Sequence, residues 1–397
     1  MSNNPDAPPA RPAILERGRT AKMARSAHAY VRGATVNFYE WLESGADVPE
    51  GPPVWICGDC HVGNLGPLAS ADGHIDIQIR DLDQTTIGNP AHDLVRLGLS
   101  LASAARGSDL PGVTTARMLE TMVEGYSLAL HGAGHDHAVP EPGVVRAVKR
   151  EALGRKWRHL AKERIQDLKP TIPLGKKFWA LEAHERAAID RFVDDEDVRR
   201  LVLALNPGAE ASDLEVADAA YWMKGCSSLG KLRYAVLVQL KGGGRKNRLA
   251  LLDIKEAVKS AAPAATGAAI PRHYGERVVA GAKALSPNLG ERTAAGTLLD
   301  RPVFVRELLP QDLKLEIEQF TRAEAVLAAR YLAFVVGRAH ARQMDLATRE
   351  AWRIELEKHH RGELDAPHWL WTNVVRLAAR HEEAYLEHCR RYALAAA

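Results

Sequence analysis

The sequence predicts an α+β protein in which a mainly helical part is combined with a small antiparallel β lobe. Residues 93–132 and 321–397 carry apolar side chains at helical spacing, so we expect amphipathic helices in both stretches. Residues 220–240 and 248–258 are instead rich in β-branched and aromatic residues. The turn KGGGRKN joins them, which predicts an antiparallel pair of strands. A chain of 397 residues can bury a substantial core and is long enough for two domains.

Four regions are expected along the chain. Residues 1–20 are rich in Pro, Asn and Ala and are predicted to be disordered. Residues 21–210 are predicted to form a helical lobe that ends at PGAEAS, where Pro and Gly interrupt the helical pattern. Residues 211–320 are predicted to form the β-rich lobe, and residues 321–397 to form helices that pack on the helical lobe.

The elements of the helical lobe follow from local patterns. A helix over 22–44 has Gly33 as an interior flaw and ends at the Gly/Pro stretch that follows it. The apolar run 54–57 predicts a short buried strand. The alternation of Ile75, Ile77 and Ile79 predicts a half-buried strand that ends in acidic residues. Amphipathic helices are expected over 93–107 and 114–132, and in the β lobe a helix over 273–285 precedes a strand over 302–309.

Composition limits the partners. A formal net charge of +3 is small for this length, so we expect no nucleic-acid partner and no membrane surface, and the oligomeric state stays open. The N-terminal residues contain no apolar stretch that could act as a signal sequence, and no uncharged apolar run could span a bilayer. Both observations favour the cytoplasm. Four cysteines in so long a chain are not a disulfide framework.

Residues 57–64, Cys-Gly-Asp-Cys-His-Val-Gly-Asn, fit more than one function. Cys57, Cys60 and His61 have the spacing of a haem c attachment site, and the same three side chains could bind zinc. Covalent haem attachment usually needs export, so the lack of a signal sequence weakens the haem interpretation. No second ligand pair with metal spacing accompanies the cysteines, which weakens the zinc interpretation. Asp59 and Asn64 have instead the spacing of a phosphotransferase catalytic loop, with an Asp base and a metal-binding Asn.

Acidic residues at the end of the next strand strengthen the phosphotransferase interpretation. Asp81 and Asp83 follow the strand that contains Ile79. Mg²⁺ prefers carboxylate and amide oxygens, and it neutralises the phosphates of ATP during transfer. We therefore expect Asp59 to be the catalytic base or to orient the acceptor hydroxyl, and Asn64 and Asp81 to bind Mg²⁺ with help from Asp83.

The motifs CGDCHVGNLG and QIRDLDQTTIGNPAHDLVRL resemble the small-molecule kinase branch of the protein-kinase-like fold. Aminoglycoside and choline kinases carry a His-Gly-Asp-x-x-x-x-Asn loop, a strand ending in Ile-Asp, a Gly-x-Pro turn and an Asp-Leu pair. The chain has these features in the same order, except that Cys57 stands where the family usually has His. The resemblance implies a two-lobed fold, ATP and Mg²⁺ as cofactors, and a small-molecule acceptor.

A glycine loop and a lysine further along the chain extend the resemblance. Gly225, Ser227, Ser228 and Gly230 lie in a turn between two expected strands, where backbone N–H groups could cover phosphates. Lys255 ends the next strand, like the kinase lysine that holds the α- and β-phosphates, and it has a catalytic role in this interpretation. Kinases pair that lysine with a Glu on the following helix; Glu276 is the candidate here, and Glu256 and Glu307 are its competitors.

The order of these motifs is reversed relative to kinases, in which the glycine loop and lysine come first. We therefore expect a circularly permuted protein-kinase-like two-lobed fold. Most of residues 20–345, from KMARSAHAYVRG to GRAHA, also resembles a bacterial family known as domain of unknown function 2252. The expected activity is ATP- and Mg²⁺-dependent transfer to a hydroxyl group. The alternatives are a non-catalytic nucleotide-binding or regulatory protein, a nucleotidyl (AMP) transferase and, more remotely, a haem or metal protein.

Overall fold

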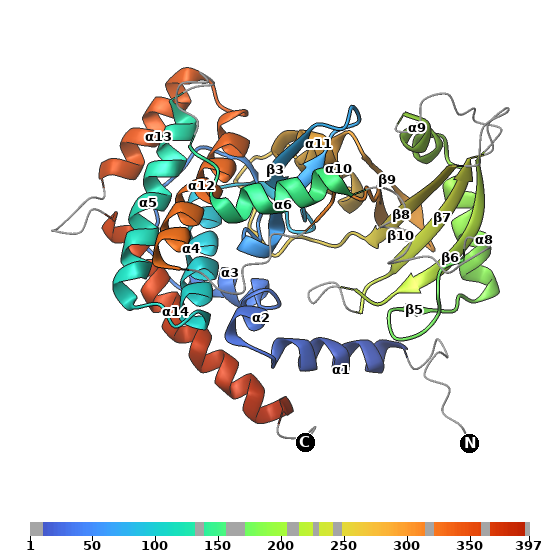
Figure 1. Ribbon diagram of the computed structural model, residues 1–397, viewed down its shortest axis with the longest axis horizontal. Coiled ribbons are helices and arrows are strands. Elements are labelled where there is room, and N and C mark those ends of the chain that lie inside the picture. Colours follow the sequence, from blue (N-terminus) through green and yellow to red (C-terminus); the bar gives the residue numbers. More distant parts are fainter. Residues whose placement is uncertain are drawn as a thin grey trace.

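The computed structural model describes residues 11–131, 139–155, 171–204, 214–224, 230–240, 248–313, 321–358 and 366–393. The protein is mixed α+β. Helices from both ends of the chain gather on one side, and a six-stranded antiparallel sheet lies on the other (Figure 1). Two large hydrophobic clusters correspond to these two parts, one among the helices and one between the sheet and the helices that cover it.

The helical part is built around three long helices, α4 (Pro90–Gly107), α5 (Gly112–Leu130) and α12 (Arg322–Ala341). Asn89 caps α4 by accepting a hydrogen bond from the Ala91 N–H, and Pro90 occupies the first turn. Helices α5 and α12 pack at close range, because a Cβ atom on Gly125 would overlap the backbone of α12. Helices α13 (Leu346–Lys358) and α14 (His368–His388) complete this part (Figure 1).

Two small antiparallel sheets lie beside these helices. Strand β1 (Val54–Ile56) pairs with β4 (Thr86–Gly88), and β2 (Leu65–Ala69) forms a hairpin with β3 (Ile75–Ile79). All but one residue of the hairpin's two strands are buried, in keeping with the alternating isoleucines of β3. The turn between β1 and β2 and the segment after β3 therefore start from rigid strands.

The six-stranded sheet has the order β5-β6-β7-β8-β10-β9. The strands are β5 (Phe178–Trp179), β6 (Leu214–Trp222), β7 (Arg233–Leu240), β8 (Arg248–Glu256), β9 (Thr293–Leu298) and β10 (Arg301–Glu307). Helices α8 (Ala183–Val193) and α9 (Glu196–Ala204) bury one face of the sheet. Helix α10 (Tyr274–Leu285), followed by α11 (Pro287–Gly290), packs against the strands and also contributes to the helical core.

Several predicted boundaries differ from the structure. Residues 11–20, predicted to be disordered, belong to helix α1 (Arg11–Met23), whose first residue makes a buried ion pair with Glu185 at 2.7 Å. The helix predicted over 22–44 is three helices: the end of α1, α2 (Ala27–Val31) and α3 (Thr35–Glu43). The helix is interrupted around Gly33, where the Met23 side chain packs against the position that a Cβ atom would take.

The start of the β lobe was also predicted too late. Residues 178–204 were assigned to the helical lobe, but β5 extends the six-stranded sheet, and α8 and α9 cover it. The charged, helical sequence of α8 and α9 is compatible with a location on the helical part or on the sheet. Only tertiary packing decides between these two locations. Helix α6 (Gly143–Gly154) does lie against the helical part, through α12 and the β2–β3 hairpin.

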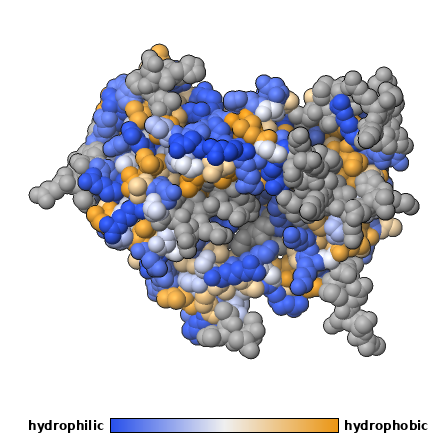
Figure 2. All heavy atoms as spheres, viewed as in Figure 1, coloured by the Kyte–Doolittle hydropathy of each residue, from blue (hydrophilic) through white to orange (hydrophobic). Residues whose placement is uncertain are grey.

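Neither the face shown in Figure 2 nor the helices show features of a membrane-spanning segment in the described part of the chain. Hydrophilic and hydrophobic residues are interspersed over the face shown in Figure 2, without one continuous apolar band. Within the described part of the chain, no helix combines the length and apolar character needed to cross a bilayer.

Candidate functional site

The loop between β1 and β2 carries Asp59 and is fixed by Asp93 at the start of α4. The Cys57 and Gly58 N–H groups donate hydrogen bonds to the two carboxylate oxygens of Asp93, at 2.7 and 3.0 Å. Gly58 has φ +74°, and a Cβ atom there would overlap the backbone oxygen of Gln84, so the turn requires glycine. The loop geometry is therefore set by its own backbone and by α4 together.

A buried chain of hydrogen bonds extends from Asp93 into the C-terminal helices. The Trp352 indole N–H donates to the Tyr126 hydroxyl at 3.1 Å, and that hydroxyl lies 2.9 Å from His340 Nδ1. His340 Nε2 lies 3.2 Å from Asp93. With its proton on Nε2, His340 satisfies both neighbours, so each donor in the chain faces an acceptor. No local sequence pattern predicts this role for these residues, because the interactions join positions more than 200 apart.

Asp59 is buried, and its carboxylate is engaged by Arg96, one turn after Asp93 on α4. Arg96 Nε donates to Asp59 Oδ1 at 2.9 Å, and His61 Nε2 lies 3.8 Å from the other carboxylate oxygen. Burial raises the pKa of Asp59 above its usual value despite the opposing charge of Arg96, and the charge of Asp81 adds to the rise. Arg96 is a site residue that motif spacing did not reveal.

Asn64 lies at the end of the same loop, in the short 3-10 turn η2 (Val62–Asn64). Its side-chain N–H₂ donates to the backbone oxygen of Asp59 at 2.9 Å. This bond leaves the amide oxygen of Asn64 without a donor among the described residues. The backbone oxygen of Asn64 accepts from the Arg80 N–H at 2.7 Å, which ties the loop to the end of β3. The amide oxygen is of the type that binds Mg²⁺.

Lys255 connects the two parts of the protein. It lies near the end of β8 in the six-stranded sheet, and its ammonium group is within 3.1 Å of Asp81 Oδ1 and 3.3 Å of Asp83 Oδ1. The lysine side chain is 3% exposed, whereas that of Asp81 is 40% exposed and that of Asp83 is 16% exposed. The carboxylates therefore reach solvent while the lysine is enclosed.

The two carboxyl groups differ in their affinity for protons. Burial acts to raise the pKa of Asp81, but the Lys255 ammonium, a hydrogen bond from Asp83 and the charge of Arg306 hold it well below its usual range. Burial and the neighbouring Asp81 charge raise the pKa of Asp83 to about 6. A cation placed between them would favour the ionised form of both.

The sheet surface around Lys255 is itself charged and buried. Asp253, two residues earlier on β8, accepts hydrogen bonds from Arg233 at 2.9 and 2.7 Å and from Arg306 at 3.1 and 3.3 Å. Burial opposes the ionised form of Asp253, but the two arginines hold its pKa well below the usual range. Because two arginines share one carboxylate, an excess of positive charge remains near Lys255 on the sheet.

The predicted glycine loop connects β6 to β7, which are antiparallel neighbours in the sheet. Gly225, Ser227 and Ser228 lie outside the described residues. Gly230, at the far end of the loop, has φ +96° and open space where a Cβ atom would lie. At the other end the Lys224 ammonium lies 4.2 Å from the centre of the Trp222 ring.

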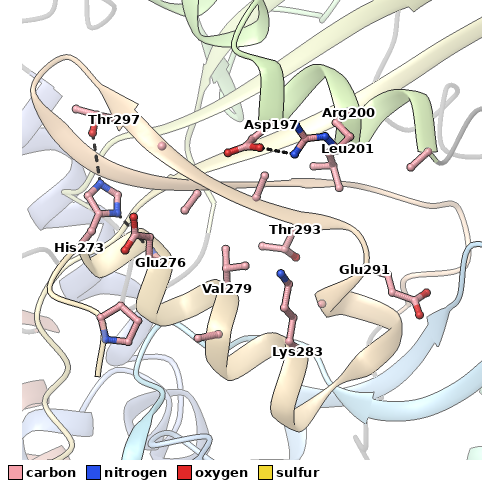
Figure 3. Close-up of a pocket in the computed structure, with 17 residues that line it drawn as sticks. Asp197, Arg200, Leu201, His273, Glu276, Val279, Lys283, Glu291, Thr293 and Thr297 are labelled. Atoms are coloured by element: carbon pink, nitrogen blue, oxygen red, sulfur yellow. Dashed lines mark hydrogen bonds and ion pairs between the residues drawn. The ribbon is translucent and has the colours of Figure 1, made fainter. Parts of the chain in front are cut away.

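Glu276 is not brought to Lys255. It is exposed on the outer side of α10 and lines a different cavity of about 830 Å³, together with Lys283 and residues of α9 and β9 (Figure 3). The next residue, Arg277, points inward instead and donates to the backbone oxygens of Asp83, Thr85 and Val258. Helical periodicity places neighbouring residues on different faces, so a glutamate beside the inward arginine faces away. The partners of Lys255 are Asp81 and Asp83.

Cys57 and Cys60 form no metal site with their neighbours in the described part of the chain. Both are buried, and the hydrogen bond with Cys60, together with burial, raises the pKa of the Cys57 thiol well above its usual value. Across the described ranges, no group of three or more His, Cys, Asp or Glu side chains is placed to hold a metal ion. This arrangement offers no support for the zinc interpretation. A magnesium site needs fewer protein ligands, because Mg²⁺ keeps several water ligands and is bound by one or two carboxylates together with substrate phosphates.

Comparison with known proteins gives a family but no named relative. The family model described as "Uncharacterized protein conserved in bacteria (DUF2252)" matches residues 12–391, which include every site residue discussed above. No curated protein and no solved structure matches the chain. The chain therefore belongs to the bacterial family DUF2252.

Proposed function

We propose that the protein is an ATP- and Mg²⁺-dependent phosphotransferase with a circularly permuted, kinase-like two-lobed architecture, and that it acts in the cytoplasm on a hydroxyl group of a small molecule. The observation that carries the proposal is the meeting of Lys255 with Asp81 and Asp83. A lysine on the antiparallel sheet and two acids at the end of a hairpin in the other part are 174 and 172 residues apart in sequence.

The arrangement of the chain supports the permuted architecture. Residues from both ends of the chain share one hydrophobic cluster, and the six-stranded sheet has a separate one. The chain thus builds the acidic hairpin first, crosses to the sheet for the glycine loop and Lys255, and returns to complete the helical core. This order is the reverse of that in kinases, where the glycine loop and lysine come first.

Each side chain has a defined role in the proposed reaction. Bound Mg²⁺ would neutralise phosphate charge, and Asn64, Asp81 and Asp83 supply the oxygen atoms that would hold it. Lys255 would move from its carboxylate partners toward the phosphates. Asp59 would orient the acceptor hydroxyl and take its proton. The hydroxyl oxygen forms a bond to the γ-phosphorus while the bond to the β–γ bridging oxygen breaks, and ADP leaves.

One observation favours a second candidate, a nucleotide-binding protein without transfer activity. Arg96 already occupies the Asp59 carboxylate, with a separation of 2.9 Å between the nearest atoms. Arg96 occupies the Oδ1 atom of this carboxylate, so that oxygen is less available to take the proton of an acceptor hydroxyl. In that case Asp59 would organise the loop, and the site would bind MgATP without turning it over.

Nucleotide binding and turnover separate the candidates. Thermal unfolding is measured with ATP, with and without Mg²⁺. At a hundredfold excess over Kd, binding is worth about 2.7 kcal/mol of stability. No stabilisation by either form would refute both candidates.

Asp59→Asn should then abolish turnover while nucleotide affinity is retained, and unchanged turnover would refute the proposed role of Asp59. Lys283 is exposed on the far side of α10, so Lys283→Ala is the matched control for a substitution of Lys255 at the site. ADP as the product indicates phosphoryl transfer, whereas pyrophosphate would indicate AMP transfer.

A further inference from the structure

Four nitrogen-bearing side chains from α2, α4 and the loop that carries Asp59 lie near one another, because the charges of His28, Arg32 and Arg96 all act on His61. Arg96 contacts the carboxylate directly, and His61 lies 3.8 Å from it. His28 belongs to α2, and Arg32 is the residue that ends this helix. Helix α2 packs on α4, so these residues come from elements in contact.

Nitrogen atoms in this group lack hydrogen-bond partners. His28 Nδ1, His61 Nδ1 and Arg96 Nη1 are buried and have no hydrogen-bond partner in the part of the chain that the structure describes. Arg32 is half-buried, and its guanidinium makes no hydrogen bond or ion pair with the described residues. Leaving a buried donor unpaired costs about 1–3 kcal/mol, so such groups in native proteins need an explanation. Several within one cluster indicate a missing acceptor.

The charges in the cluster point in the same direction. Burial lowers the pKa of His61 well below its usual value, and the charges of Arg32 and Arg96 lower it further. The pKa of His28 is lowered by burial and by Arg32. Asp59, which pairs with Arg96, and Asp81, whose charge also acts on His61, are acids near the group. Neither forms an ion pair with Arg32 among the described residues.

Gly63 lies between the side chains of His61 and Arg32. A Cβ atom at this position would lie 3.3 Å from His61 Nδ1 and 3.4 Å from Arg32 Nε, so the two nitrogen atoms flank the same backbone position. An anion bound beside Gly63 could accept a hydrogen bond from Arg32, and a second from His61 when the imidazole proton is on Nδ1.

We propose that His28, Arg32, His61 and Arg96 bind an anionic group of the acceptor, a phosphate or a carboxylate, beside the hydroxyl that receives the phosphoryl group. This inference rests on the proposed phosphotransferase function. The nucleotide phosphates are assigned to Lys255 on the sheet, whereas these four residues come from α2, α4 and the loop, and Arg96 among them contacts the residue that orients the hydroxyl. The acceptor is then a hydroxylated phosphate or hydroxylated acid.

The test uses inorganic phosphate as the probe with the full-length chain. Its affinity is measured by titration calorimetry in the absence and presence of Mg²⁺ and a non-hydrolysable ATP analogue. We expect phosphate to bind in both conditions. Arg32→Gln should weaken it by about ten- to a hundredfold, as expected for the loss of a charge-assisted hydrogen bond. Arg322→Gln, at an exposed residue at the start of α12, removes the same charge and should change nothing.

Gly63→Ala provides a second variant, because its methyl group would crowd the His61 and Arg32 side chains and displace them from their present positions. It should also weaken phosphate binding. Absence of phosphate binding, or equal binding by Arg32→Gln and the unaltered chain, would overturn the proposal. Displacement of phosphate by the ATP analogue would overturn it too, because the ion would then occupy the nucleotide's own phosphate site.

The acceptor assignment has its own readout. Glycerol 3-phosphate and glycerate should compete with bound phosphate, whereas glycerol should not; equal competition by all three would contradict the assignment. If phosphate binds through Arg32 but the ATP analogue does not bind at all, the phosphotransferase function fails while the anion site stands. The two failures are therefore distinguishable.

Discussion

Replacing Lys255 by Met tests the centre of the candidate site. The substitution keeps the length of the side chain and removes the ammonium group that lies 3.1 Å from Asp81 and 3.3 Å from Asp83. Breaking a buried ion pair costs about 3–5 kcal/mol. The side chain of Asp81 is 40% exposed, so water compensates part of the loss, and we expect about 2–3 kcal/mol.

A double-mutant cycle separates the ion pair from the lost packing. In the Lys255→Met background, Asp81→Asn should cost less than in the unaltered chain, because it removes one of two carboxylates that no longer have a cation. We expect a coupling energy of about 1–2 kcal/mol. Urea unfolding followed by circular dichroism measures stability, and calorimetric titration measures MgATP affinity, which should fall at least about tenfold in Lys255→Met.

The matched control is Lys283→Met, which removes an exposed lysine from the outer side of α10. It should leave both stability and MgATP affinity unchanged. If Lys255→Met unfolds at the same urea concentration as the unaltered chain and binds MgATP equally well, the ion-pair argument is wrong. The permuted kinase-like arrangement would then lose its main support.

Three further predictions concern the frame around the site. Gly58→Ala should destabilise the protein by more than about 3 kcal/mol in urea unfolding, because it adds a steric overlap to the strain of a left-handed backbone conformation. Gly267→Ala is the control: Gly267 has φ +75° and open space around it, so this variant should show only the backbone strain of about 1–2 kcal/mol. Tyr126→Phe should lower stability by about 1 kcal/mol and reduce turnover, since it breaks the hydrogen-bond chain to Asp93, and unchanged unfolding and turnover would contradict that role. Burial lowers the pKa of His381 to about 3. Below pH about 6.5 the imidazole of His381 is therefore protonated in the unfolded chain but stays neutral in the folded protein. The free energy of unfolding should fall by roughly 3–5 kcal/mol between pH 6.5 and 3. His381→Leu should flatten this part of the stability curve, whereas His368→Leu, at an exposed histidine, should leave its slope intact.

The chain of hydrogen bonds behind Asp93 has a consequence for how the two ends of the sequence cooperate. His340 and Trp352 lie in the C-terminal helices, yet they fix the carboxylate that holds the Cys57 and Gly58 N–H groups. The loop that carries Asp59 is therefore stabilised by residues that lie more than 200 positions later in the chain. Removal of the C-terminal helices should disorganise this loop as well as the helical core.

Local patterns were sufficient for most of the elements near the site. Alternating isoleucines predicted β3, the apolar run 54–57 predicted β1, and helical spacing predicted α10 to within one residue. The acids at the end of β3 and the lysine near the end of β8 could be chosen from sequence, because strand ends and glycine turns are recognisable over a few residues.

Tertiary structure decided which residues meet. Glu276 was the expected partner of Lys255, but helix α10 turns Arg277 inward and leaves Glu276 exposed, while Asp81 and Asp83 take the lysine. The location of α8 and α9 on the sheet and the pairing of Arg96 with Asp59 were likewise invisible in the pattern. Periodicity reports on one turn or one strand, which is enough to say what an element is. The partner of a buried charge is set by packing between segments that lie far apart in the chain, and only the folded protein brings these together.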